Sequence, residues 1–164
     1  MTIIVCPLDA AADACAAHGA GHVISLLAPP AMAPDFPGPA ERLLLSFNDI
    51  VGPAEGLIAP DAHHIRRLLA FLETWDRRSP LLIHCWAGVS RSTAAGYVAA
   101  TLRDGPGSEA ALASTLRERA PFATPNSLII ALADQALGRQ GAMTAAIAGI
   151  GRGAETAKGA LFRL

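Results

Sequence analysis

Four short apolar runs alternate with longer segments of helical character along this chain of 164 residues. The runs occupy residues 2–5, 22–27, 43–47 and 81–84. Each has the length of a typical strand and is bounded by turn residues or helix caps, so each is predicted to be a buried strand. A parallel pair of strands needs a crossover connection, usually a helix. The pattern therefore predicts an α/β fold with a central, mostly parallel sheet of about four to five strands, flanked by helices on both sides.

The segments that follow these runs predict the helices. Asp9 and Asp61 are expected as N-caps of the first two helices, and Gly19 as the residue that ends the first one. The expected helical ranges are 9–18, 61–77, 92–103, 108–119 and a last segment that ends near residue 137. A surface loop is expected over residues 28–39 because proline interrupts regular structure, and this stretch holds five: Pro29, Pro30, Pro34, Pro37 and Pro39.

Residues 1–164 are expected to form one domain, because this length suits a single hydrophobic core. Hydrophobic residues make up 52% of the chain and charged residues only 16%, so there is enough apolar material to bury. Residues 138–164 are rich in Gly and Ala. They fit either a packed terminal helix or a loosely held tail.

Charge and cysteine content narrow the range of partners and compartments. The formal net charge of -1 gives no sequence-wide field that would attract nucleic acid or an acidic membrane. No apolar stretch approaches the roughly 20 residues that span a bilayer. Cys6, Cys15 and Cys85 contain no CxxC pair and predict no disulfide framework, which favours a reducing compartment. We therefore expect a cytoplasmic protein, while its oligomeric state is left open.

Residues 84–92, with the sequence HCWAGVSRS, are the most informative stretch. A cysteine ends a buried strand here, and an arginine opens a helix after a short loop. Backbone N–H groups in such a loop can converge on one point, and the helix adds its unpaired N-terminal amides and its positive dipole end. This arrangement is predicted to bind a dianion such as phosphate.

The same field would stabilise the thiolate form of Cys85 and make it a nucleophile. Arg91 supplies a planar guanidinium that can hold two phosphoryl oxygens at once, which a lysine would do poorly. Gly88 would permit the tight turn.

These residues resemble the signature of the cysteine-based protein tyrosine phosphatase superfamily: His-Cys, five residues, Arg, then Ser or Thr. The resemblance extends more weakly over residues 43–137. Residues 119–126, RAPFATPN, are similar to the Arg-Pro…Pro-Asn segment of the dual-specificity branch, except that Ala120 replaces the first proline. The resemblance implies a phosphatase-like fold and a phosphomonoester hydrolase that needs no metal or other cofactor. Its substrate would be a phosphorylated protein or a small phosphomonoester.

The resemblance also implies a role for each matching residue. Cys85 would attack phosphorus, Arg91 would hold the phosphoryl group, and Ser92 would assist breakdown of the cysteinyl-phosphate. His84 would orient the loop and help to keep the thiolate ionised. The phosphate or another oxyanion would bind to the loop formed by Trp86, Ala87, Gly88, Val89, Ser90 and Arg91.

A general acid is needed because an alkoxide or phenoxide leaves poorly without a proton. In the superfamily the acid is an aspartate on a loop some thirty residues upstream. The candidates are Asp49, 36 residues before Cys85, and Asp61, 24 residues before it. Asp49 is preferred because it follows a strand at the start of the expected loop 48–60, whereas Asp61 has a role as a helix cap. Asp49 would then act as base in the second step.

Several alternatives remain open at this point. The loop could belong to a catalytically weak phosphate-binding module of the pseudophosphatase type. Sulfur transfer or arsenate reduction would need a second thiol, for which Cys6 and Cys15 are the candidates, although both also fit buried structural roles. Trp86 could form a wall of the substrate pocket or pack against the protein. The pair His63 and His64 is interpreted as surface residues rather than as metal ligands.

Overall fold

A five-stranded sheet in the order β3-β2-β4-β1-β5 forms the centre of the molecule in the computed structural model, which describes residues 1–36, 38 and 41–164. The first four strands are parallel to their neighbours, and β5 runs antiparallel to β1. The predicted mostly parallel sheet is therefore confirmed. The strands are β1 (Ile3–Pro7), β2 (His22–Leu27), β3 (Glu41–Ser46), β4 (Leu81–Cys85) and β5 (Phe162–Arg163).

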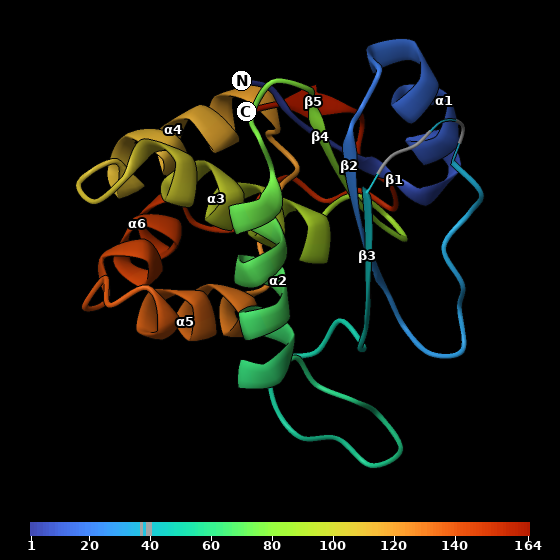
Figure 1. The fold of residues 1–164 in the computed structure, drawn as a ribbon. Coiled ribbons are helices and arrows are strands. Elements are labelled where there is room, and N and C mark those ends of the chain that lie inside the picture. The colour runs from blue at the N-terminus through green and yellow to red at the C-terminus, as the bar shows by residue number, and fades with distance from the viewer. Residues whose placement is uncertain (37, 39–40) are drawn as a thin grey trace.

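Helices cover both faces of the sheet, as the alternating pattern predicts. In Figure 1 helix α1 lies alone on one side of the sheet, and the remaining helices lie on the other. The helices are α1 (Leu8–His18), α2 (Ala62–Thr74), α3 (Arg91–Asp104), α4 (Glu109–Arg119), α5 (Ser127–Ala136) and α6 (Ala142–Ile150). None of the helices in the described ranges has the length and hydropathy that a membrane crossing would need.

Some predicted boundaries need correction. Helix α1 begins directly after Pro7, which is its N-cap, so Asp9 lies in the first turn and is not the cap. Proline suits this position because it has no backbone N–H, and N–H groups at the start of a helix have no partner within the helix. Helix α2 ends at Thr74 and not near Arg77, because the chain turns extended at Trp75. Asp61 does cap α2, and Gly19 ends α1 in the left-handed conformation, both as predicted.

The stretch with five prolines has no helix or strand over its described residues, 28–36 and 38. Pro37 and Pro39 lie outside the described residues.

The C-terminal segment is packed against the rest of the protein and is not a loose tail. After α6 the chain crosses to the sheet and adds β5 as an edge strand, which the sequence analysis did not predict. Leu164 exchanges two backbone hydrogen bonds with Ile3, at 2.9 and 3.1 Å. A two-residue strand has too short a pattern to be recognised from sequence.

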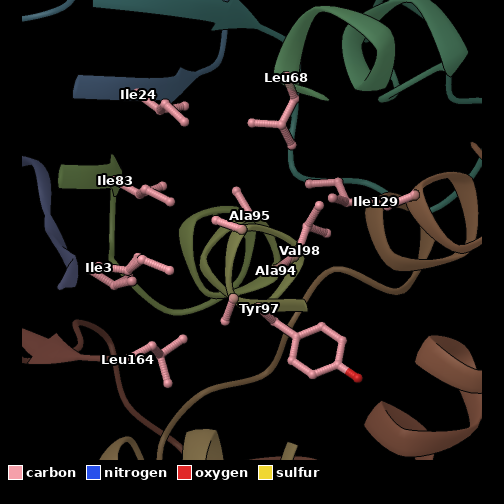
Figure 2. Close-up of a cluster of buried hydrophobic side chains, with 14 of the residues drawn as sticks. Ile3, Ile24, Leu68, Ile83, Ala94, Ala95, Tyr97, Val98, Ile129 and Leu164 are labelled. Atoms are coloured by element: carbon pink, nitrogen blue, oxygen red, sulfur yellow. The ribbon is translucent and has the colours of Figure 1, made fainter. Parts of the chain in front are cut away.

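Helix α3 is buried along most of its length and lies against the sheet. Figure 2 shows Ala95 of α3 on the side of the helix nearest Ile83 of the sheet, and Val98 on the side nearest Ile129. Small residues let the helix approach closely: a Cβ on Gly96 would lie 2.7 Å from a methyl carbon of Val5. Close packing of α3 holds the start of this helix at a defined position beside the end of β4.

Side chains of β4 alternate between the two cores. Ile83 and Cys85 belong to the large core that contains α3. Leu82 belongs to the smaller core under α1. This period of two places the Cys85 sulfur on the α3 side of the sheet and His84 on the α1 side.

Candidate active site

The loops that follow β1, β2, β3 and β4 meet at one edge of the sheet, since these strands are parallel. The Cys85 loop, residues 85–91, joins β4 to α3 at this edge. Binding sites in open α/β sheets are expected at the carboxyl ends of the strands.

The Cys85 loop directs its carbonyl groups outward. Four of them accept hydrogen bonds from backbone amides elsewhere in the chain. The pairs are Trp86 O with Leu8 N at 3.2 Å, Ala87 O with Gly159 N at 2.8 Å, Val89 O with Thr124 N at 3.0 Å, and Ser90 O with Asn126 N at 3.3 Å. A trans peptide unit holds its C=O and N–H on opposite sides, so an outward carbonyl turns the next N–H inward.

The inward amides form almost no hydrogen bonds within the described part of the chain. Gly88 N–H donates to the Cys85 sulfur. The other three inward amides, those of Ala87, Ser90 and Arg91, find no acceptor within residues 1–36, 38 and 41–164. Converging N–H groups without partners form the kind of nest that binds anions.

The sulfur of Cys85 lies in this nest. It accepts a hydrogen bond from Gly88 N at 3.3 Å and lies 3.1 Å from the hydroxyl oxygen of Ser92. The residue is only 2% exposed. Two hydrogen-bonding groups, Gly88 N–H and the Ser92 hydroxyl, therefore contact the sulfur inside the loop.

Gly88 is required by the shape of this loop. Its φ is +72°, and a Cβ there would lie 2.7 Å from the backbone nitrogen of Pro7. A side chain would therefore both strain the backbone and push the loop away from β1.

Arg91 lies at the end of the loop with its guanidinium buried. Its Nη1 donates to Phe47 O at 2.9 Å, which anchors the group to the end of β3. Its buried Nε has no hydrogen-bond partner in the described part of the chain. A buried donor without a partner is costly, so Nε is placed to receive an acceptor from a bound molecule.

Asp49 lies beside this guanidinium. Its Oδ2 is 4.0 Å from Arg91 Nε, and its Oδ1 accepts hydrogen bonds from Ser90 Oγ at 2.7 Å and from Asn126 Nδ2 at 2.8 Å. The side chain is 37% exposed. The carboxyl group is thus held at the site while it stays open to solvent.

Solved phosphatase structures share this architecture. Human DUSP28 superposes with a TM-score of 0.61 at 18% sequence identity, covering 85% of this chain and 94% of that chain. The human tyrosine phosphatase-like serine/threonine/tyrosine-interacting protein gives a TM-score of 0.63 at 20% identity, covering 83% of this chain and 91% of that chain. The chain has the dual-specificity phosphatase fold.

The same fold occurs in a mouse dual specificity phosphatase complexed with zinc tungstate. Its TM-score is 0.60 at 20% identity, and 83% of this chain and 84% of that chain are covered. No family model and no curated protein matches the sequence. The dual-specificity phosphatase fold implied by the His-Cys…Arg-Ser motif is therefore confirmed through three-dimensional similarity.

Within this phosphatase fold, Asp61 serves a different purpose from Asp49. It forms a capping box with His64: Asp61 Oδ1 accepts from His64 N at 2.9 Å, and His64 Nδ1 accepts from Asp61 N at 3.3 Å. The backbone hydrogen bond from His64 holds the pKa of Asp61 below its ordinary value. Asp61 thus has the capping role predicted for it, while Asp49 is the candidate that lies beside Arg91.

His84 is buried and forms a hydrogen bond of 2.7 Å between its Nε2 and Ser25 Oγ. Burial lowers its pKa from the ordinary 6.5 to about 4. The imidazole is therefore neutral near pH 7 and brings no positive charge to the thiolate. The geometry fits an orienting role, whereas the expected help in keeping the thiolate ionised finds no charge to support it.

Trp86 is 66% exposed, so it does not pack into the protein. Of the two roles left open for this residue, packing against the protein is wrong, and a wall of the substrate pocket stays a prediction. His64 belongs to the capping box of α2 and its ring contacts Phe47. No cluster of three His, Cys, Asp or Glu residues that could hold a metal occurs in the described part of the chain.

Cys6 and Cys15 lie in the smaller core under α1, on the opposite side of the sheet from the Cys85 sulfur. Burial raises the pKa of Cys6 to about 12 and also raises that of Cys15. Both thiols are therefore protonated and enclosed, which fits structural roles. A resolving thiol would have to reach the other face of the sheet.

Asn126 closes the segment 119–126 that carries the weaker resemblance, but the sequence analysis predicted no role for it in the site. It is 3% exposed, and its Oδ1 caps α5 by accepting from Leu128 N and Ile129 N, both at 3.1 Å. The Pro-Asn pair before a predicted helix was the available signal for the cap. Its contact with Asp49, 77 positions away, could not be found from sequence.

Proposed function

We propose that the protein hydrolyses phosphomonoesters through a cysteinyl-phosphate intermediate. One observation carries this proposal: the Cys85 sulfur and the unpartnered Arg91 Nε belong to one loop whose free amides point inward. Three equatorial phosphoryl oxygens need several donors, and the loop amides and the guanidinium are the donors at hand.

In the first step the Cys85 thiolate attacks phosphorus and the bond to the ester oxygen breaks. Asp49, protonated, gives its proton to the departing oxygen. Arg91 and the loop amides stabilise the negative charge on the phosphoryl oxygens in the transition state. The products of this step are a free alcohol or phenol and a phosphorylated Cys85.

In the second step Asp49, now a carboxylate, takes a proton from water as the water oxygen attacks phosphorus. The S–P bond breaks, inorganic phosphate leaves, and the sulfur departs as a thiolate. Ser92 assists because its hydroxyl, 3.1 Å from the sulfur, can donate to the departing thiolate. Every proton is accounted for within Asp49, water and the product.

The substrate class we propose is a phosphorylated protein or a small phosphomonoester. Tyr97, the single tyrosine of the chain, is fully buried in α3, so it cannot form an aromatic recognition loop. The mouse neighbour was solved with zinc tungstate, whose tungstate ion is a tetrahedral oxyanion, and this supports oxyanion binding by the same fold. A thiolate nucleophile also suits a reducing compartment, and we place the protein in the cytoplasm.

The test is the turnover of p-nitrophenyl phosphate by the wild-type protein and by three variants. We expect hydrolysis by the wild type, loss of activity in Cys85→Ser, and a large loss in Arg91→Lys, because an ammonium cannot offer the same two parallel donors. Ser92→Ala should retain formation of the intermediate and slow its breakdown. Turnover that persists in Cys85→Ser would overturn the proposal.

A phosphate-binding module without turnover is the alternative. One structural neighbour is named as phosphatase-like, so the fold alone does not distinguish an enzyme from a binding module. The binding module would show saturable binding of tungstate to the wild type, weakened in Arg91→Lys, together with no release of p-nitrophenol.

A further inference from the structure

The segment between α6 and β5, residues 151–161, lies against the outside of the Cys85 loop. We call it the C-terminal strap. In Figure 1 it is the red chain that leaves α6 and crosses the molecule to reach β5. Its contact with the loop is the hydrogen bond of 2.8 Å from Gly159 N to Ala87 O.

This contact acts on the peptide unit that faces the nucleophile. Ala87 O and Gly88 N belong to the same peptide plane, so a donor that holds the oxygen outward also holds the N–H inward. Gly88 N–H is the amide that reaches the Cys85 sulfur, at 3.3 Å. Gly159 is therefore connected to the sulfur through one rigid planar unit.

The outer donors of the neighbouring peptide units come from other parts of the chain. Trp86 O is held by Leu8 N at the start of α1, and Val89 O by Thr124 N before α5. Among the described residues the strap alone supplies the amide that holds Ala87 O. Its removal would leave the peptide unit between Ala87 and Gly88 free to rotate.

Close approach of the strap depends on glycine. A Cβ on Gly159 would collide with Cε2 of the Phe122 ring and would lie 2.8 Å from Gly88 O. A Cβ on Gly153 would lie 2.5 Å from Ala123 O. The contacts with Ala123 O and Gly88 O involve backbone atoms, which cannot move aside at low cost.

Polar contacts hold the strap at both of its ends. Arg117 donates to Gly151 O at 2.7 Å and to Ala123 O at 2.9 Å, so one guanidinium joins the start of the strap to the turn before α5. Near the other end, Lys158 forms an ion pair with Asp9 of α1. The strap is thus seated on elements that also support the Cys85 loop.

We infer that the C-terminal strap is a positioning element for the nucleophile, and that Gly159 sets the orientation of the peptide unit between Ala87 and Gly88. The expected effect of the strap on turnover rests on the proposed function. The expected effect of the strap on the reactivity of the Cys85 sulfur can be measured whether or not the protein turns over a substrate. Gly159 touches neither substrate nor sulfur and acts through Ala87.

The main test compares Gly159→Ala with Gly149→Ala. Gly149 lies in α6, where a Cβ meets nothing within 4 Å outside its own helix, so it is a matched control from the same region. Iodoacetate labelling of Cys85 is followed over a range of pH, and kcat and KM are measured with p-nitrophenyl phosphate. The folded state of each variant is checked by circular dichroism and thermal melting.

For Gly159→Ala we expect labelling of Cys85 on the acidic side of neutrality to fall about tenfold or more, since a hydrogen bond to a charged group is lost. Labelling in alkaline solution should not change, because the thiol is then ionised in every variant. The kcat should fall with the acidic labelling rate. Gly149→Ala should match the wild type in all of these measurements.

A folded Gly159→Ala protein with the labelling profile and kcat of Gly149→Ala would overturn the inference. If the wild type labels as expected but never turns over substrate, the proposed function fails and the labelling comparison still decides the role of the strap.

A measurement on the wild type covers the case in which Gly159→Ala does not fold. Hydrogen exchange of the Gly159 amide is followed by NMR with and without saturating sodium tungstate. We expect this amide to exchange more slowly when tungstate orders the loop. An unchanged Gly159 amide, together with slower exchange of the amides of Ala87 and Ser90, would show that the strap is not coupled to the loop and would overturn the inference.

Discussion

The side-chain amide of Asn126 donates a hydrogen bond of 2.8 Å to Oδ1 of Asp49. The same side chain caps α5, and the backbone N–H of Asn126 donates to Ser90 O at 3.3 Å. One residue therefore joins the loop that carries the proposed acid, the loop that carries the nucleophile, and a helix of the core. The Asp49 carboxyl group and the Cys85 loop are thus held at fixed positions relative to each other by a residue that takes part in neither proposed chemical step.

Replacement of Asn126 by alanine should reduce turnover through misplacement of Asp49. We expect kcat to fall about tenfold or more for an alkyl phosphate, whose leaving group needs the proton, and less for p-nitrophenyl phosphate, whose leaving group does not. The loss of the helix cap should also destabilise the protein by about 1 kcal/mol. Steady-state kinetics with both substrates checks the prediction.

The matched control for this variant is Asp61→Ala. It also removes a helix cap, with an expected stability loss of about 1 kcal/mol, but from α2. Activity should stay at the wild-type level. If Asn126→Ala kept the kcat of Asp61→Ala for both substrates, Asn126 would contribute only stability.

Asp49→Asn and Asp61→Asn separate the two candidate acids. Loss of a general acid costs roughly 10²–10⁴ in rate, so Asp49→Asn should lower kcat strongly for an alkyl phosphate. The limb of the pH–rate profile that falls towards alkaline pH should flatten, since it reports loss of the acid's proton. Asp61→Asn should keep both the rate and the profile. The reverse outcome would assign the acid to Asp61.

His84 should make folding stability depend on pH. Burial lowers its pKa from 6.5 to about 4, so between these values the unfolded chain binds a proton that the folded protein does not. The contribution of His84 to folding stability is therefore complete above its pKa in the unfolded chain. This contribution is lost as the pH falls towards its pKa in the folded protein. The shift predicts a loss of about 2 kcal/mol between about pH 7 and about pH 5.

Urea unfolding of the wild type and of His84→Gln at several pH values measures this contribution. Glutamine can keep a hydrogen bond to Ser25 but does not titrate in this range. The difference in unfolding free energy between the two proteins should decrease by about 2 kcal/mol from about pH 7 to about pH 5. A constant difference would mean that the pKa of His84 is the same in the folded and the unfolded protein.

The three cysteines should react very differently in the folded protein. Cys6 is fully buried with a pKa raised to about 12, and burial also raises the pKa of Cys15. Cys85 alone has donors aimed at its sulfur. Brief treatment with iodoacetamide near neutral pH, followed by mass spectrometry of peptides, should modify Cys85 and leave the others until urea is added. Equal labelling of Cys6 would show that the core under α1 opens freely.

Much of this fold could be predicted because its signals are local. Short apolar runs marked four strands, and the change from strand to tight loop to helix after Leu81 marked the site. Asp61 was recognised as a cap because a capping residue and its helix are adjacent in sequence. The dependence of the loop on Gly88 follows from local backbone geometry in the same way.

The remaining features depend on distant contacts. The pairing of β5 with β1 and the contact of Gly159 with Ala87 join residues that no sequence pattern links. Pro7 took the capping position expected for Asp9 because the strand continues directly into α1. The charge state of His84 depends on how deeply the α1 side of the sheet is buried, which a single strand pattern does not specify.

The most direct test of the account is to trap a covalent phosphoenzyme. Asp49→Ala is mixed with ³²P-labelled p-nitrophenyl phosphate and quenched, and the label is located by peptide mapping. Because p-nitrophenolate leaves without an acid while hydrolysis of the intermediate needs the base, phosphate should accumulate on Cys85. No label should appear in Cys85→Ser. Label on another residue, or turnover by the wild type with no labelled intermediate at any quench time in either protein, would contradict the account.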